Sequence, residues 1–183
     1  MTIPDQFKGE YGQEKRVVMT FELAGYTKAF ETKNDEEVAR FVDDYYQLCE
    51  NVLAKHGGTI LKFMGDGCLA TFPPEATVEA VGSALELQRA VDVLAKRYHQ
   101  LRLVFGANIH VAVVVEGSFG TGQSRRSDIV GRGVNQTFLL GRGPGIRLSE
   151  QAYHQLPNEA RTQWNEHKPP AIYHLTSSST HGV

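Results

Sequence analysis

Two carboxylates lie where the sequence pattern predicts that the chain turns. Glu22 ends an apolar run at residues 16–22 and comes shortly before Gly25, and Asp66 stands between two glycines. Carboxylate oxygens are the ligands that hard divalent cations such as Mg²⁺ prefer. By itself, however, a glycine-aspartate-glycine sequence is typical of a plain hairpin turn. The two acids are therefore of chemical interest only if the fold brings them together.

Other polar residues interrupt apolar or helical segments. Lys62 lies within the run ILKFM, where a strand with one exposed face would leave the ammonium group in solvent. Asn135 lies in a short segment with a helical pattern, and the ordinary interpretation is an amide on a helix surface. Residue types alone do not separate these interpretations from functional ones.

The hydrophobic pattern predicts an α+β fold. Strands are expected at residues 16–22, 59–64, 68–72 and 108–115, and long helices at 34–55 and 76–98. This order is the βαββαβ pattern of a ferredoxin-like core with both helices on one face of the sheet. A C-terminal α/β extension follows, with a glycine- and serine-rich excursion at 117–128, helices at 131–140 and 150–156, and short strands at 146–148 and 171–175.

The ends of the chain and its composition complete this prediction. Residues 1–15 are expected to form a flexible arm and 177–183 a disordered tail, which leaves one domain at 16–176. The 183 residues are 41% hydrophobic and carry a net charge of −2, which argues against nucleic acid and anionic membranes as partners. No apolar run is long enough to span a bilayer. Cys49 and Cys68 show neither metal-binding nor disulfide spacing, so a cytoplasmic location is expected.

Three motifs in this order resemble the catalytic domain of the class III nucleotidyl cyclases, the adenylate and guanylate cyclase family. They are FELAGYT at residues 21–27, GGTILKFMGDG at 57–67 and DIVGRGVN at 128–135. The resemblance covers residues 16–176 and implies the nucleotidyl cyclase fold. It also implies an enzyme in which the ribose 3′-hydroxyl attacks the α-phosphate of a nucleoside triphosphate and pyrophosphate leaves.

The resemblance implies that the two acids bind metal. Two divalent cations, Mg²⁺ or Mn²⁺, would be held by Glu22, Asp66 and the main-chain carbonyl of Leu23. Such cations lower the pKa of the attacking hydroxyl and neutralise charge on the leaving oxygens. Phosphate oxygens would be held by the turn after Glu22 and by a lysine near the C-terminus, namely Gly25, Tyr26, Thr27 and Lys168.

The resemblance also implies how the nucleotide is recognised. Lys62 and Asp128 would read the adenine base, which makes ATP the expected substrate, and Asn135 would orient the ribose. In the family the site is shared across a dimer, with the metal acids from one chain and the base-reading residues from the other. The chain is accordingly expected to form a homodimer, or a heterodimer with a second cyclase chain.

Two positions depart from the family pattern. The first metal ligand is normally aspartate, whereas here it is Glu22, which is one methylene longer. Four residues after the asparagine, the family has an arginine that stabilises the transition state, and this chain has Leu139. Loss of one such donor costs about 10²- to 10³-fold in rate. Arg142 is the substitute candidate, although Gly141 and the glycines that follow predict that the helix ends first.

Two hypotheses follow from these departures. The first is an adenylate cyclase of low activity that prefers Mn²⁺, because Mn²⁺ tolerates the longer acid better. The alternative is a catalytically degenerate cyclase-homology domain that acts as a nucleotide-binding or dimerising regulatory module. Cyclisation of a different nucleotide has less support, because Lys62 and Asp128 both match the adenine pattern.

Overall fold

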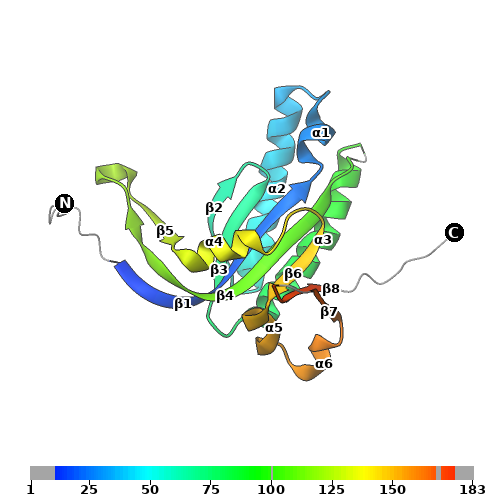
Figure 1. Cartoon of the computed structure of the whole chain (residues 1–183). Helices are drawn as coiled ribbons and strands as arrows, with labels where there is room; N and C mark the ends of the chain where they lie inside the picture. The colour runs from blue at the N-terminus through cyan, green and yellow to red at the C-terminus, as the bar shows by residue number, and fades with distance from the viewer. Residues whose placement is uncertain (1–10, 100, 168–169, 176–183) are drawn as a thin grey trace.

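The described part of the chain is built around a single mixed β-sheet (Figure 1). The computed structural model describes residues 11–99, 101–167 and 170–175. Its strands are β1 (Tyr11–Ala24), β2 (Thr59–Met64), β3 (Gly67–Phe72), β4 (Val104–Phe119), β5 (Arg126–Val130), β6 (Gly145–Ser149), β7 (Trp164–His167) and β8 (Ile172–Leu175). Its α-helices are α1 (Tyr26–Phe30), α2 (Asp35–Lys55), α3 (Thr77–Arg97), α4 (Arg132–Leu139), α5 (Glu150–Gln155) and α6 (Asn158–Arg161). The strand order is β2-β3-β1-β4-β6-β8-β7, and β5 pairs with β4 outside this path.

The central elements form the predicted βαββαβ core. β1 is antiparallel to both β3 and β4, and α2 and α3 lie on one face of the sheet (Figure 1). α2 begins with a capping box, in which the Asn34 side chain accepts from the Glu37 N–H and the Glu37 carboxylate accepts from the Asn34 N–H. It ends at Lys55 before Gly57, whose φ of 74° suits glycine. The α+β prediction is confirmed.

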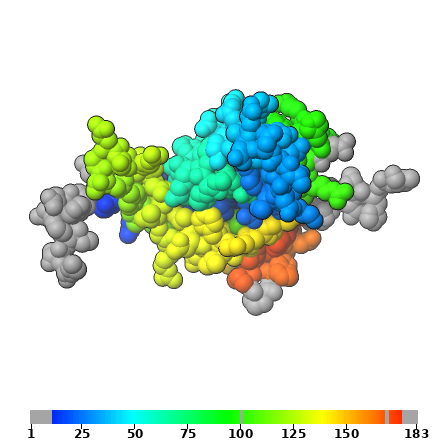
Figure 2. All heavy atoms as spheres, turned by 90° about the horizontal axis from the view of Figure 1, so that it is seen from above, coloured from blue at the N-terminus to red at the C-terminus, as the bar shows by residue number. Residues whose placement is uncertain are grey.

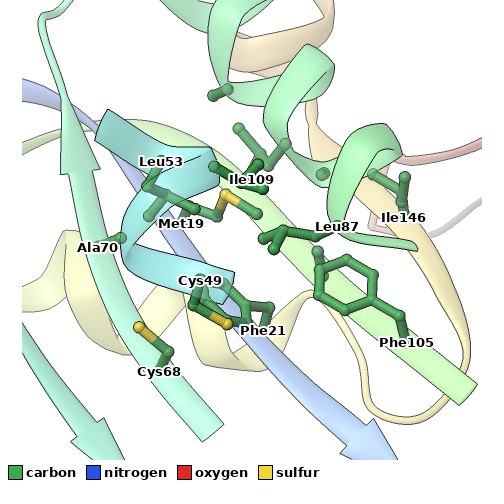
Figure 3. Close-up of a cluster of buried hydrophobic side chains, with 14 of the residues drawn as sticks. Met19, Phe21, Cys49, Leu53, Cys68, Ala70, Leu87, Phe105, Ile109 and Ile146 are labelled. Carbon is green, nitrogen blue, oxygen red and sulfur yellow. The ribbon is translucent and has the colours of Figure 1, made fainter. Parts of the chain in front are cut away.

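The main hydrophobic core lies between the sheet and these two helices (Figure 3). The odd-numbered β1 residues Val17, Met19, Phe21 and Leu23 belong to it, together with residues such as Cys49, Leu53, Cys68, Leu87 and Phe105. Both thiols are fully buried and unpaired, and burial raises the pKa of Cys49 to about 12. Because side chains alternate along a strand, Thr20 and Glu22 face the opposite side of the sheet. There α4 covers a second cluster of Val18, Leu69, Val114, Ile129 and Val134.

Two predictions about chain ends and loops were wrong in part. Residues 11–15 are not part of an arm but belong to β1, which pairs with β4 from Tyr11↔Gly117 onward. Within the expected excursion at 117–128, β4 continues to Phe119 and β5 begins at Arg126. The ring of Tyr11 stacks on Phe119 at 5.2 Å. Residues 1–10 and the expected tail at 177–183 lie outside the described residues.

The C-terminal extension has more elements than the pattern predicted. α5, β6 and β8 match the expected helix and strands, whereas α6 and β7 were not predicted, and neither was the short α1. These elements have four or five residues, too few to show a periodicity. Among the described residues, no helix combines the length and the apolar character that crossing a membrane would require.

Candidate functional site

Both predicted metal-binding acids lie at the C-terminal end of β1. The N–H of Leu23 donates to Asp66 Oδ2 at 3.3 Å, so the β2–β3 turn lies against the strand next to Glu22. Tyrosine hydroxyls from α2 hold this turn, since Tyr45 donates to the Asp66 carbonyl at 3.3 Å and Tyr46 to the Gly65 carbonyl at 2.8 Å. The carboxylate of Asp66 is thereby fixed at the strand end.

Glu22 borders a cavity on the face of the sheet that α4 covers. The cavity has a volume of about 330 Å³, and its lining includes Glu22, Met64, Asn108, Phe138, Arg142 and Arg147. Glu22 Oε1 accepts a hydrogen bond from the Gly143 N–H at 2.9 Å. In the view from above, part of β1 is visible between the β2–β3 hairpin and α4 with the loop that follows it (Figure 2). The sheet contributes polar groups to this lining, namely Thr20 and Glu22 of β1, Asn108 of β4 and Arg147 of β6.

Arg147 is a site residue that the sequence reasoning missed. It lies in β6 with 7% of its surface exposed, and its guanidinium donates to four main-chain carbonyls of residues 142–145. Burial lowers the pKa of Arg147, and the nearby negative charge of Glu22 opposes this effect. An arginine inside the short apolar run at 146–148 was the signal available in the sequence. It could not be interpreted without the position of the preceding loop.

Lys62 and Asp128 meet although 66 positions separate them. The Lys62 ammonium lies 2.5 Å from Asp128 Oδ2, and the second oxygen, Oδ1, accepts from the Ile129 N–H at 2.8 Å. β2 and β5 carry the two residues, which are 41% and 23% exposed at the side chain. The predicted pair therefore exists in one chain, at a position open to solvent. Asn135 is exposed on α4 and does not line the cavity around Glu22.

The predicted phosphate-binding turn is tightly built. Gly25 has a φ of 88°, and a Cβ there would lie 2.7 Å from the Arg102 carbonyl oxygen, so only glycine fits. α1 starts directly afterwards with Tyr26 and Thr27. Burial, with a further contribution from Asp66, raises the pKa of Tyr26, so its hydroxyl stays protonated at neutral pH. Lys168 lies outside the described residues.

The side chain at the position that lacks the expected arginine is mostly exposed to solvent. Leu139 is the last residue of α4 and is 78% exposed. Arg142 lies beyond the end of the helix, so it does not share a helix face with Asn135. It lines the cavity with Glu22 instead. The structure thus places Arg142 beside a predicted metal ligand of its own chain.

Comparisons with known proteins lead to the same class of protein as the sequence motifs. No family model matches the chain. An adenylate cyclase from Anabaena cylindrica is 28% identical over 134 residues, which are 69% of this chain and 27% of that protein. The adenylyl cyclase CyaB from P. aeruginosa superposes with a TM-score of 0.80 at 20% identity, over 95% of this chain and 100% of that one. The guanylyl cyclase Cya2 gives a TM-score of 0.78 at 23% identity, over 96% of this chain and 98% of that one.

These similarities confirm the resemblance stated from the motifs. The chain has the fold of the class III nucleotidyl cyclase catalytic domains, and its sequence relatives include proteins named adenylate cyclase. It spans between 27% and 34% of the length of the first curated relatives. Because both adenylyl and guanylyl cyclases share the fold, the choice of nucleotide depends on the site itself.

Proposed function

We propose that the chain is a nucleotidyl cyclase domain that converts ATP to cyclic AMP and pyrophosphate, with low activity, at a site shared by two copies. The observation that carries this proposal is the contact between Lys62 and Asp128, because it joins two motifs distant in sequence into one polar recognition pair. A lysine donates and a carboxylate accepts, which suits the acceptor and donor on the edge of adenine. Nucleotide binding would exchange part of this ion pair for contacts with the base.

Exposed apolar side chains support the assembly of two copies. Met64 and Phe138 border the cavity, Leu139 follows on α4, and Val130 ends β5; each of the four is at least 40% exposed. Apolar side chains gathered near a polar site are typical of a surface that a partner covers. A symmetric dimer through this face would form two equivalent sites.

The residues at the end of β1 fit a cation that arrives with the nucleotide. Among the described residues, no three side chains of the histidine, cysteine, aspartate or glutamate type gather as a metal centre of their own. Mg²⁺ at phosphate sites needs only one or two carboxylates, and substrate phosphates and water supply the rest. Asp66, Glu22 and the Leu23 carbonyl would hold it. Bound there, a divalent cation lowers the pKa of the ribose hydroxyl and offsets phosphoryl charge.

The chain itself supplies position and hydrogen bonds for the reaction. Lys62 and Asp128 would fix the base, and Asn135 would orient the ribose so that its 3′-hydroxyl faces the α-phosphate. The N–H groups after Gly25 would hold phosphate oxygens at the start of α1. Holding the two reacting groups in this geometry removes much of the entropic cost of the reaction. Leu139 leaves the developing phosphoryl charge without one donor, which accounts for the low activity.

A nucleotide assay tests this proposal directly. The purified chain is incubated with each of the four nucleoside triphosphates and Mn²⁺ or Mg²⁺, and products are separated by HPLC. We expect cyclic AMP from ATP, faster with Mn²⁺, and loss of product in Asp66→Asn. Asp92→Asn on the exposed surface of α3 is the matched control and should keep wild-type activity. Product from the wild type that does not exceed the Asp66→Asn background would refute cyclase activity.

The exposed side chain of Leu139 favours a second candidate function. A leucine at this position cannot donate to phosphate, so the chain could bind ATP as a regulatory module without turning it over. Isothermal titration calorimetry with ATP and Mn²⁺ separates the two. Saturable binding with no cyclic AMP supports the module, whereas turnover excludes it.

A further inference from the structure

The loop between α4 and β6, residues 140–144, is held by one buried cation. Arg147 donates from Nη1 to the carbonyls of Gly143 and Gly145 at 3.2 and 3.3 Å, and from Nη2 to those of Arg142 and Pro144 at 2.7 and 2.8 Å. Buried charges are tolerated where hydrogen bonds replace water. The guanidinium therefore sets the path of this loop.

β4 has a glycine at the point where the loop lies against the sheet. A Cβ on Gly106 would lie 2.1 Å from the Gly143 carbonyl oxygen, so the loop rests directly on the backbone of β4. Gly106 is the register partner of Glu22 across β1 and β4. The Asn108 side chain also donates from Nδ2 to the Gly141 carbonyl at 2.8 Å. The loop is thus fixed to the sheet beside the glutamate.

This arrangement directs one main-chain N–H at Glu22. The Gly143 N–H donates to Glu22 Oε1 at 2.9 Å, while its carbonyl accepts from Arg147. Oε1 is therefore engaged within the chain, whereas Oε2 makes no hydrogen bond with any of the described residues. Arg147 contacts the loop, and the loop contacts the carboxylate.

We propose that Arg147 is a positioning residue for Glu22, which uses the α4–β6 loop to anchor Oε1 so that Oε2 alone binds the divalent cation. The anchor takes up the extra methylene that distinguishes Glu22 from aspartate. A single carboxylate oxygen suits the octahedral coordination of Mg²⁺ and Mn²⁺, which bidentate binding distorts. This inference rests on the proposed function only in assigning a cation to the end of β1, because its test measures binding and not turnover.

The test measures Mn²⁺ binding by electron paramagnetic resonance in the presence of α,β-methylene ATP, which the chain cannot cyclise. Arg147→Met removes the loop contacts, and Arg147→Lys keeps the charge but lacks the planar group that spans several carbonyls. Arg161→Met is the matched control, because this guanidinium also donates to a main-chain carbonyl, that of His154, but lies on α6 outside the cavity lining. Circular dichroism shows whether each variant is folded. If Arg147→Met does not fold, the test is made with Arg147→Lys.

A double-mutant cycle separates positioning from general support of the fold. Glu22→Asp shortens the side chain, so the aspartate no longer needs the anchor. We expect the Arg147 variants to weaken Mn²⁺ binding about tenfold with Glu22 present and less than about twofold in the Glu22→Asp background, a size typical of outer-shell residues. Arg161→Met should bind Mn²⁺ as the wild type does.

Two results would overturn the inference. Equal weakening in both backgrounds would mean that Arg147 only supports the fold, and unchanged binding in a folded Arg147 variant would mean that the loop does not act on Glu22. If the wild type shows no saturable Mn²⁺ binding, Glu22 holds no cation and the inference is refuted as well. Wild-type Mn²⁺ binding that follows the expected pattern without cyclic AMP formation would refute only the proposed function.

Discussion

Leu139→Arg is the substitution with the largest expected gain in rate. Leu139 lies four residues after Asn135 on α4, and both are exposed, so they share one face of the helix. An arginine there would extend from the same face as the predicted ribose-orienting amide. Because the present side chain is 78% exposed, the change should alter the free energy of unfolding by less than about 0.5 kcal/mol.

The size of the gain follows from two opposing terms. A positioned donor to a charged transition state contributes about 3–4 kcal/mol. Within its own chain, an arginine at this exposed helix end has no neighbour to hold it, and ordering it costs about 2 kcal/mol of side-chain entropy. The net of about 1–2 kcal/mol corresponds to about a 5- to 30-fold rise in kcat with little change in KM, since the contact forms only in the transition state.

The assay is cyclic AMP formation at saturating ATP and Mn²⁺, with a thermal melt for each variant. Val93→Arg is the matched control, because Val93 is also an exposed apolar side chain but lies on α3. We expect no change in its kcat. A folded Leu139→Arg variant whose kcat changes less than twofold, or a gain that Val93→Arg reproduces, would refute the idea that this position lacks a transition-state donor.

Three further predictions concern single contacts. Asp128→Asn should raise KM for ATP in steady-state assays while changing unfolding free energy by less than about 1 kcal/mol, because the ion pair with Lys62 is partly exposed; a loss of kcat alone would contradict base recognition. Burial lowers the pKa of His110, so below about pH 6.5 the unfolded chain binds more protons than the folded chain. The free energy of unfolding should therefore decrease as the pH is lowered through this range, by at most about 1.4 kcal/mol per pH unit. His110→Gln should flatten this slope in urea unfolding. Gly106→Ala should cost about 1–3 kcal/mol in urea unfolding, because its Cβ meets a loop carbonyl; Gly12→Ala, with 3.9 Å of room, should cost less.

The core could be predicted because its local signals agree with its tertiary structure. The sequence from Asn34 to Glu37 contains a capping box that needs no distant partner, and α2 begins there. The nearly continuous apolar run of β1 likewise reflects burial on both faces of the sheet, since all residues from Val17 to Phe21 are buried. Residues 11–15 are exposed and mostly polar, and only pairing with β4 makes them a strand. Because the partner lies about a hundred positions away, no local pattern could indicate it.

The candidate site could be predicted only in part, because some of its contacts join residues that are distant in sequence. The family resemblance predicted that Lys62 and Asp128 act together, and the structure places their side chains in contact. Arg147 was missed because its role comes from the path of the α4–β6 loop, which depends on Gly106 in another strand. A guanidinium bonded to main-chain carbonyls leaves no signature in the types of its partner residues.

The two departures from the family pattern differ in whether other residues of the chain are arranged around the changed side chain. Glu22 is accommodated, since a loop amide, a glycine in β4 and a buried arginine are all arranged around its carboxylate. Leu139 is not, because it points into solvent at the end of α4, and Arg142 lies beyond that end in the cavity of Glu22. A residue that has been compensated within the chain is consistent with a retained cation site. Under the proposed function, the uncompensated Leu139 assigns the low rate to the missing transition-state donor, which a second chain that approaches the face of α4 would have to supply.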